Sequence, residues 1–202
     1  MNRLLKMAGL LTVAGATVAA ATYPNGWNVD TAHTGVNFSV RHFFTPVRGT
    51  FSDYEVNLNF DAENPENSSF VVTIATKSVN TGVEKRDNHL RSADWFEVDK
   101  YPHMTFKSKS IKQVGENQFL AAGDLTIKDV TKRVELPITL LGIKEIPESM
   151  QAMLGGVRRV ASFEGSGEVD RRDFSVGVGT WAETVVVSPD VKIEFTLEAN
   201  AK

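Results

Sequence analysis

Apolar and polar residues alternate with a period of two along most of the chain from Val36 onward. Val36, Phe38 and Val40 alternate with polar neighbours, and successive side chains of a strand point to opposite faces. Each such segment is therefore predicted to be a β-strand with one apolar and one solvated face. The same alternation recurs at positions 53–60, 70–74, 104–107, 119–127, 133–140 and 191–198.

The solvated faces predict how these strands are arranged. Parallel sheets covered by helices give continuous apolar runs, whereas antiparallel sheets with one wet side give clean alternation. Asn, Gly, Asp and Pro separate the strands, as expected for turns. The pattern indicates an all-β protein, either a sandwich or a closed barrel, because periodicity alone does not separate the two.

Two segments interrupt the alternation. Thr81 and Glu84 have the spacing of a capping box, and Asp87 and Arg91 that of an i,i+4 ion pair. We therefore predict a short helix from about Gly82 to Ala93, lying over one end of the strands. The segment 143–159 carries apolar residues at helical spacing before a Gly-Gly pair. It is either a connecting loop with a helical turn or a mobile lid with a methionine-rich underside.

The first 21 residues resemble a secretory signal peptide. Arg3 and Lys6 precede an apolar run that ends in Ala19-Ala20-Ala21, a small-residue cleavage pattern. The run is shorter than the roughly 20 residues that a spanning helix needs. We expect cleavage after Ala21, export to the periplasm, and a mature domain over 22–202 that is not an integral membrane protein.

Composition narrows the function further. The chain has no cysteine and a net charge of −3, with both signs scattered along it. Without a basic cluster, a nucleic-acid partner is not expected. Without cysteine, neither a disulfide nor a lipid-modified N-terminus is expected, so the core alone must stabilise the domain.

Several motifs resemble the YceI family of periplasmic proteins, in order along the mature chain. They begin at Trp27 and continue through Gly49 and Phe51 to a central block and two later ones. The residues that match are Trp27, Asp30, His33-Thr34, Val36, Phe38, Val40, His42, Gly49, Phe51, Arg86-Asp87, His89-Leu90, Ser92, Asp94, Tyr101-Pro102, Thr105-Phe106, 123–127, 130–132, Arg171 and Asp173-Phe174. Thr34, Ser175 and a long 143–159 segment depart from the family pattern.

The resemblance implies an antiparallel, lipocalin-like closed barrel, which we expect to have about eight strands and one short helix over one end. It also implies an elongated apolar tunnel for a polyisoprenoid or isoprenoid-quinone-like ligand, with no cofactor. A membrane partner is compatible with this, and the protein is expected to be a monomer or a homodimer.

The apolar registers predict which residues line the tunnel. We expect Phe38, Val40, Tyr54, Leu58, Phe106, Leu125, Leu136 and Phe195 to face inward. Polar or amphipathic residues near the rim are candidates for contacting a ligand head group. These are His42, Arg86, His89 and Trp95.

Sequence motifs typical of catalytic sites are weak compared with the family motifs. No His pair has metal-ligand spacing and no Gly-x-Ser-x-Gly elbow occurs, so we expect neither a catalytic residue nor a metal ligand. A metal site assembled from distant strands stays open as an alternative. The alternative function is a small hydrolase or isomerase of an amphipathic substrate, with His33, His42 or His89 as its base.

Overall fold

The computed structural model describes residues 26–182 and 185–202, and it is built almost entirely from antiparallel strands. The predicted signal peptide, 1–21, and its cleavage site lie outside the described residues. The strands are β1 (Trp27–His42), β2 (Thr45–Phe51), β3 (Tyr54–Asn59), β4 (Ser69–Ala75), β5 (Val79–Asn80), β6 (His103–Gly115), β7 (Gln118–Ile127), β8 (Val130–Glu145), β9 (Arg159–Asp170) and β10 (Val187–Ala201).

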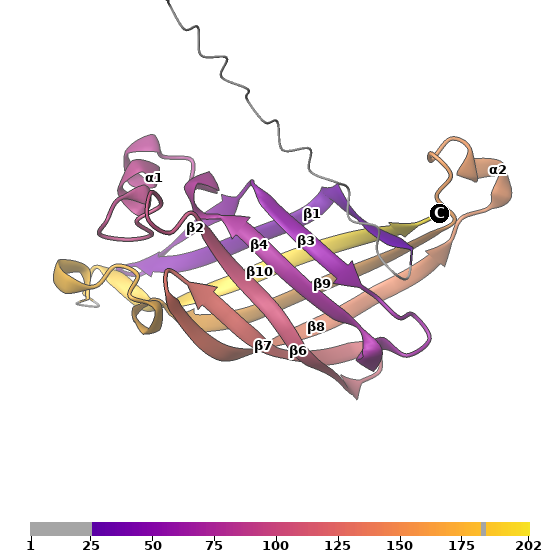
Figure 1. Cartoon of the computed structure of the whole chain (residues 1–202). Helices are drawn as coiled ribbons and strands as arrows, with labels where there is room; N and C mark the ends of the chain where they lie inside the picture. The colour runs from indigo at the N-terminus through magenta and orange to yellow at the C-terminus, as the bar shows by residue number, and fades with distance from the viewer. Residues whose placement is uncertain (1–25, 183–184) are drawn as a thin grey trace, which may run out of the picture.

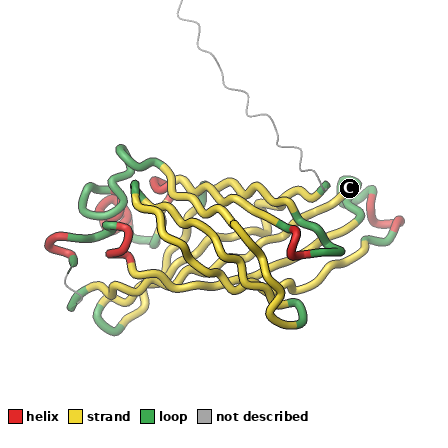
Figure 2. Tube along the Cα trace, turned by 60° about the horizontal axis from the view of Figure 1, so that its bottom comes forward, coloured by secondary structure: helices red, strands yellow, loops and turns green. Residues whose placement is uncertain are grey.

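All ten strands form one sheet in the order β3-β4-β6-β7-β8-β9-β10-β1-β2-β5, and the sheet curls around an elongated interior (Figures 1 and 2). The all-β, antiparallel prediction is confirmed. The prediction of a closed barrel of about eight strands is inexact, because the sheet has ten strands. Within the described residues, its two edge strands, β3 and β5, do not pair with each other.

A side chain bridges the seam that the backbone leaves open. The hydroxyl of Tyr54, on edge strand β3, donates to the carbonyl of Thr34 in β1. Thr34 lies where β1 departs from its ladder with β10, between Asp30 and Gly35. The Thr34 hydroxyl donates to the Asp30 carbonyl and accepts from the backbone N–H of Glu198, which fixes this bulge. A bulge bends a strand, so β1 meets β3 through side chains rather than through a ladder.

Helix α1 (Glu84–Arg91) confirms that a short helix lies at one end of the sheet, but the predicted cap is wrong. Val83 is the N-cap, and Thr81 instead donates from both its backbone and its hydroxyl to the buried Asp87 carboxylate. The predicted Asp87–Arg91 ion pair is also absent. Arg91 donates to the carbonyls of Lys77 and Val79, and so ties the helix to the edge of the sheet.

The segment 143–159 is the end of β8, a loop with the single-turn helix α2 (Glu148–Gln151), and the start of β9. Figure 1 places α2 beside the C-terminus, at the end of the sheet opposite α1. The described part of the chain also contains four 3₁₀ turns: η1 (Pro65–Asn67), η2 (Thr76–Ser78), η3 (Arg171–Phe174) and η4 (Gly179–Trp181). Within the described residues, no helix has the length and apolar character needed to cross a bilayer.

Candidate ligand-binding site

The curled sheet encloses a cavity of about 230 Å³ whose lining is almost entirely apolar. Residues of β1, β2, β3, β4, β6, β7, β8, β9 and β10 line it, joined by Leu90 of α1 and by residues that follow this helix. Aromatic rings recur along the wall, where Phe38 packs on Phe51 and Phe70 stacks on Phe106 with centroids 5.4 and 5.3 Å apart. Such a space favours an apolar guest, because burying apolar surface there removes it from water.

The cavity contains most of the residues that alternation placed on the inner face. Seven of them lie in its lining: Phe38, Val40, Leu58, Phe106, Leu125, Leu136 and Phe195. Tyr54 does not line the cavity, because its side chain extends to β1, where its hydroxyl donates to the Thr34 carbonyl. No residue from Ile143 to Arg159 belongs to the lining, so the structure gives the lid interpretation no support.

Three of the lining phenylalanines lie over glycines of the adjacent strands. A Cβ atom added to Gly49, Gly123 or Gly165 would come within 2.3–2.4 Å of the Cζ atom of Phe38, Phe106 or Phe195. Each ring therefore occupies the space that a side chain on the next strand would fill. As a result the rings lie against the wall instead of projecting across the interior.

Trp95 and Phe96, which follow α1, line the cavity at the α1 end. Trp95 is 7% exposed and packs against Trp181, with ring centroids 6.0 Å apart. Its indole Nε1 is buried and has no hydrogen-bond partner within the described residues. A buried donor without an acceptor costs about 1–3 kcal/mol, so a ligand oxygen that reaches this atom would remove that cost.

Arg171, in η3, is a buried cation beneath this end of the cavity. It is 4% exposed, and its guanidinium lies 5.2 Å from the Trp95 ring centroid. Its nitrogens donate to five backbone carbonyls, and burial lowers the pKa of its side chain. The carbonyls belong to Val176, Gly177, Trp181, Val187 and Ser188.

In the sequence, Arg171 matches a family motif, but nothing in its context indicates a role. Its neighbours in the sequence, Asp170, Arg172 and Asp173, make the segment look like a solvated charged turn. Ser175, two residues after Asp173, has a left-handed backbone conformation with a φ of 56°. This is a conformation that favours glycine.

The other predicted head-group residues lie outside the lining. Arg86 donates to the hydroxyl and carbonyl of Thr81, so it anchors α1. The His89 ring bonds to Asp94 at 2.9 Å and packs on Trp181. His42 lies at the end of β1, where its ring packs edge-on against Phe43. Of the four rim candidates, only Trp95 reaches the cavity.

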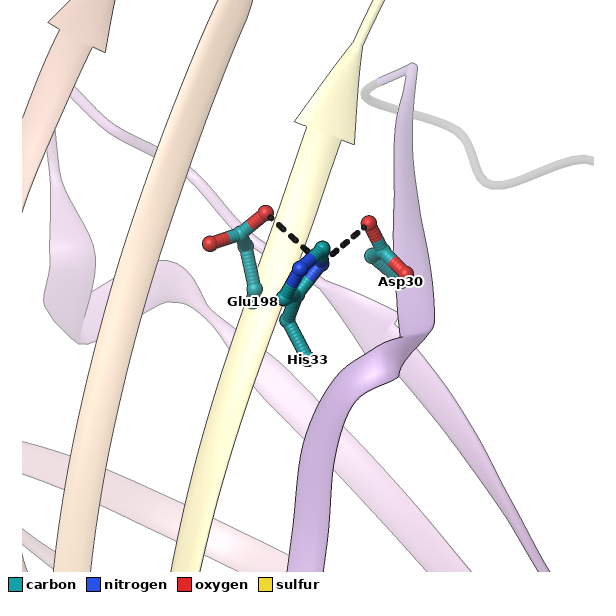
Figure 3. A group of neighbouring side chains, drawn as sticks. All are labelled: Asp30, His33 and Glu198. Carbon is teal, nitrogen blue, oxygen red and sulfur yellow. Dashed lines mark hydrogen bonds and ion pairs between the residues drawn. The ribbon is translucent and has the colours of Figure 1, made fainter.

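His33, the remaining candidate base, lies in the β1 bulge on the outer side of the wall, between two carboxylates (Figure 3). Its Nδ1 atom is 3.0 Å from Asp30 Oδ2 and 3.7 Å from Glu198 Oε1. The three groups lie within 4.8 Å of one another and so have the spacing of a metal site. We assign no metal to them, because exposed acidic groups commonly have this spacing without an ion and nothing else here points to one.

The Asp30–His33 contact predicts a pH dependence. The hydrogen bond to Asp30, followed by the charges of Asp30 and Glu198, raises the pKa of His33 above 6.5. The hydrogen bond to His33 lowers the pKa of Asp30 below 3.8. The contribution of His33 to stability is therefore complete below pH 6.5 and lost as the pH rises through its raised pKa. The contribution of Asp30 to stability is complete above pH 3.8 and is lost as the pH falls through its lowered pKa.

An NMR titration of the His33 ring checks this dependence. We expect a pKa above 6.5 in the unaltered protein and a lower value in Asp30→Asn. Asp124→Asn, which removes a carboxylate paired with Lys109 on strands that do not neighbour β1, should have no effect on it. An identical His33 titration in the unaltered and Asp30→Asn proteins would contradict the assignment.

The pattern that defines the YceI-like domain matches residues 27–199. The chain belongs to the YceI family. It is 38% identical over 175 residues to Protein YceI of Shigella flexneri, a match that covers 85% of this chain and 84% of that protein. It is 39% identical to a UPF0312 protein of Ectopseudomonas mendocina, over 76% of this chain and 78% of that one. The family prediction is confirmed.

Solved structures of relatives have the same fold. BcnA of Burkholderia cenocepacia matches with a TM-score of 0.74 and 27% identity, covering 85% of this chain and 99% of that one. The Campylobacter jejuni YCEI protein matches with a TM-score of 0.66 and 27% identity, over 98% and 99%. A polyisoprenoid binding domain of Saccharophagus degradans shares the fold at 18% identity and a TM-score of 0.61, over 88% and 99%.

Proposed function

We propose that this YceI protein binds a long-chain isoprenoid lipid, of the polyprenyl or isoprenoid-quinone type, and carries it through the periplasm. The proposal includes export by residues 1–21 and cleavage after Ala21. The observation that carries it is the apolar cavity. Among the described residues, its one charged lining residue is Arg171, which already donates to five protein carbonyls. The polyisoprenoid binding domain with the same fold supports the choice of ligand class.

The chemistry of the lining favours a long hydrocarbon over a compact polar molecule. Each buried methylene contributes about 0.8 kcal/mol before the cost of ordering the chain is subtracted. No histidine, carboxylate or lysine belongs to the lining within the described residues. A polar substrate would therefore leave its own groups without partners, which costs free energy.

The lining also suggests which end of the cavity holds the polar head of the ligand. Trp95 is the predicted head-group residue that reaches the cavity, and its buried Nε1 has no partner within the described residues. We propose that a neutral oxygen, such as a hydroxyl or a quinone carbonyl, accepts from Trp95 at the α1 end. The hydrocarbon then extends between Phe38, Phe106 and Phe195.

A titration with prenols of increasing length tests the proposal. We expect affinity to strengthen by about tenfold or more for each added isoprene unit, until the cavity is filled, and then to level off. Trp95→Phe should weaken prenol binding by about 1 kcal/mol. It should leave the affinity for an unsubstituted hydrocarbon of equal length unchanged.

Affinity that ignores chain length would contradict a carrier of long lipids. Recovery of a chemically altered ligand would instead favour the hydrolase or isomerase alternative. The position of the histidines favours the carrier, because His33, His42 and His89 all lie outside the lining. A base must reach the proton that it removes, within hydrogen-bonding distance or through one water.

A further inference from the structure

The turn between β1 and β2 exposes two adjacent aromatic residues to solvent. His42 pairs with Thr45, so Phe43 and Phe44 form a two-residue hairpin loop. Phe44 is 90% exposed and Phe43 is 53% exposed. Loops of this length favour Asn, Asp and Gly, which tolerate both water and left-handed backbone. Phe43 nevertheless has a φ of 52°, which is costly for a bulky residue.

The folded chain gains little from these two rings. They bury only part of their surface, and the Phe43 backbone carries strain that Asn or Gly would avoid. The loop is nevertheless held in place, because the Phe43 N–H donates to Val186 and the Arg41 guanidinium donates to the Phe44 carbonyl. An ordered loop that presents two aromatic rings to water is typical of a surface that meets an apolar partner.

The charges of the hairpin indicate what that partner is. From residue 31 to residue 52 the chain has no Asp or Glu, whereas Arg41 and Arg48 are both exposed. Both lie in the outward register of the hairpin, since Arg48 pairs with Ser39 and Arg41 with Pro46, while Val40 pairs with Val47 across the inner face. An acidic residue, Asp190, lies on β10, but it is near Arg172, and the two opposite charges partly offset each other. Exposed phenylalanines flanked by arginines match the interface of an anionic bilayer.

The opposite end of the molecule is also apolar, but its charges differ. The segment around α2 exposes Met153, which is 73% exposed, together with Met150 and Leu154. Glu145 and Glu148 are exposed in the same segment beside Lys144 and Arg158, so its charges are of both signs, whereas the 41–48 hairpin carries arginines and no acidic residue. The two ends therefore provide a comparison within one protein.

We propose that the 41–48 hairpin docks on an anionic lipid surface, inserting Phe43 and Phe44 between the head groups while Arg41 and Arg48 contact them. This inference rests on the proposed function, because a carrier of a water-insoluble lipid must exchange it with a membrane. Docking brings α1 and the residues that follow it, which lie at this same end of the cavity, against the bilayer (Figure 1).

Co-sedimentation of the natively processed protein with vesicles tests the docking surface. The probes are phosphatidylcholine vesicles with and without a quarter of phosphatidylglycerol. We expect binding to the anionic vesicles that falls about tenfold or more in Phe44→Ser. Arg41→Gln combined with Arg48→Gln should remove the preference for anionic lipid, and added salt should do the same to the unaltered protein.

Met153→Ser is the matched control, because it removes another strongly exposed apolar side chain, at the other end of the molecule, and should leave vesicle binding unchanged. Equal vesicle binding by Phe44→Ser and the unaltered protein would overturn the proposal, as would an equal loss in Met153→Ser. A Phe44-dependent dimer that forms without vesicles would overturn it in favour of a second copy as the partner. Prenol affinity measured without vesicles should be unchanged in Phe44→Ser, so failure of docking and failure of cavity binding are separate results.

Discussion

Replacing Arg171 by Met is expected to lower the free energy of unfolding by at least about 3 kcal/mol, the largest effect on stability that we predict. Methionine fills a similar volume but donates no hydrogen bond. Five carbonyls that now accept from the guanidinium would lose a partner in an environment where water has little access. The cation–π contact with Trp95 would also be lost.

Arg172→Met is the matched control. Its guanidinium is exposed and pairs on the surface with Asp170, at 2.6 Å between Nη2 and Oδ2. Exposed pairs contribute about 0–1 kcal/mol, so this variant should unfold close to the unaltered protein in a denaturant titration. Equal losses in the two variants would mean that Arg171 does not organise the chain between η3 and β10.

Replacing Gly165 by Ala is expected to weaken prenol binding by about tenfold or more. The new Cβ would lie 2.3 Å from Cζ of Phe195, too close for the ring to keep its place against the wall. The ring must then turn into the cavity and occupy volume that the ligand needs. The Pro137 carbonyl, 2.7 Å from the same position, also has to move, so a stability cost of about 1–3 kcal/mol should accompany the loss of binding.

Two further variants separate lost space from general damage. Gly35→Ala makes the same change at another position of the cavity wall, where the nearest atom, Thr196 Oγ1, is at an ordinary 3.5 Å. It should bind prenol normally. Phe195→Leu in the Gly165→Ala background should restore part of the affinity, because the smaller side chain leaves room for the added methyl group. Unchanged binding in Gly165→Ala would show that the Phe195 ring does not border the ligand.

The inner face of most strands could be predicted from the sequence because the information is local. Side chains alternate along any strand, so Phe38, Phe106 and Phe195 reveal their faces within a few residues. The family could be predicted for a similar reason, since its motifs are short and keep their order. The position of Trp95 at the end of the cavity also follows from a prediction that a short helix lies over one end.

Strand β9 shows where local information fails. The alternation of apolar residues is interrupted at Gly165 and Gly167, so this strand does not stand out among the alternating segments of the sequence. In the structure Phe195 and Leu136, from the two neighbouring strands, occupy the space above these glycines. Side chains of other strands thus cover the inner face of β9 at these two glycines, between its own lining residues Phe163 and Val169, which only the register of the sheet could reveal.

The sequence alone determined three features: the alternation of the strands, the family motifs and a helix over one end of the sheet. Each of them depends on residues that are close together in the chain. Tertiary structure decided the rest. Tyr54 has the alternation of a lining residue, yet it bridges the seam because β1 bends away from β10 beside it. Arg171 has the sequence context of a surface charge, yet it is buried because the chain from η3 to β10 folds its carbonyls around it. The partner of Tyr54 is 20 residues away, and the carbonyls around Arg171 lie 5 to 17 residues along a stretch that follows no periodic pattern, so no local pattern specifies either contact.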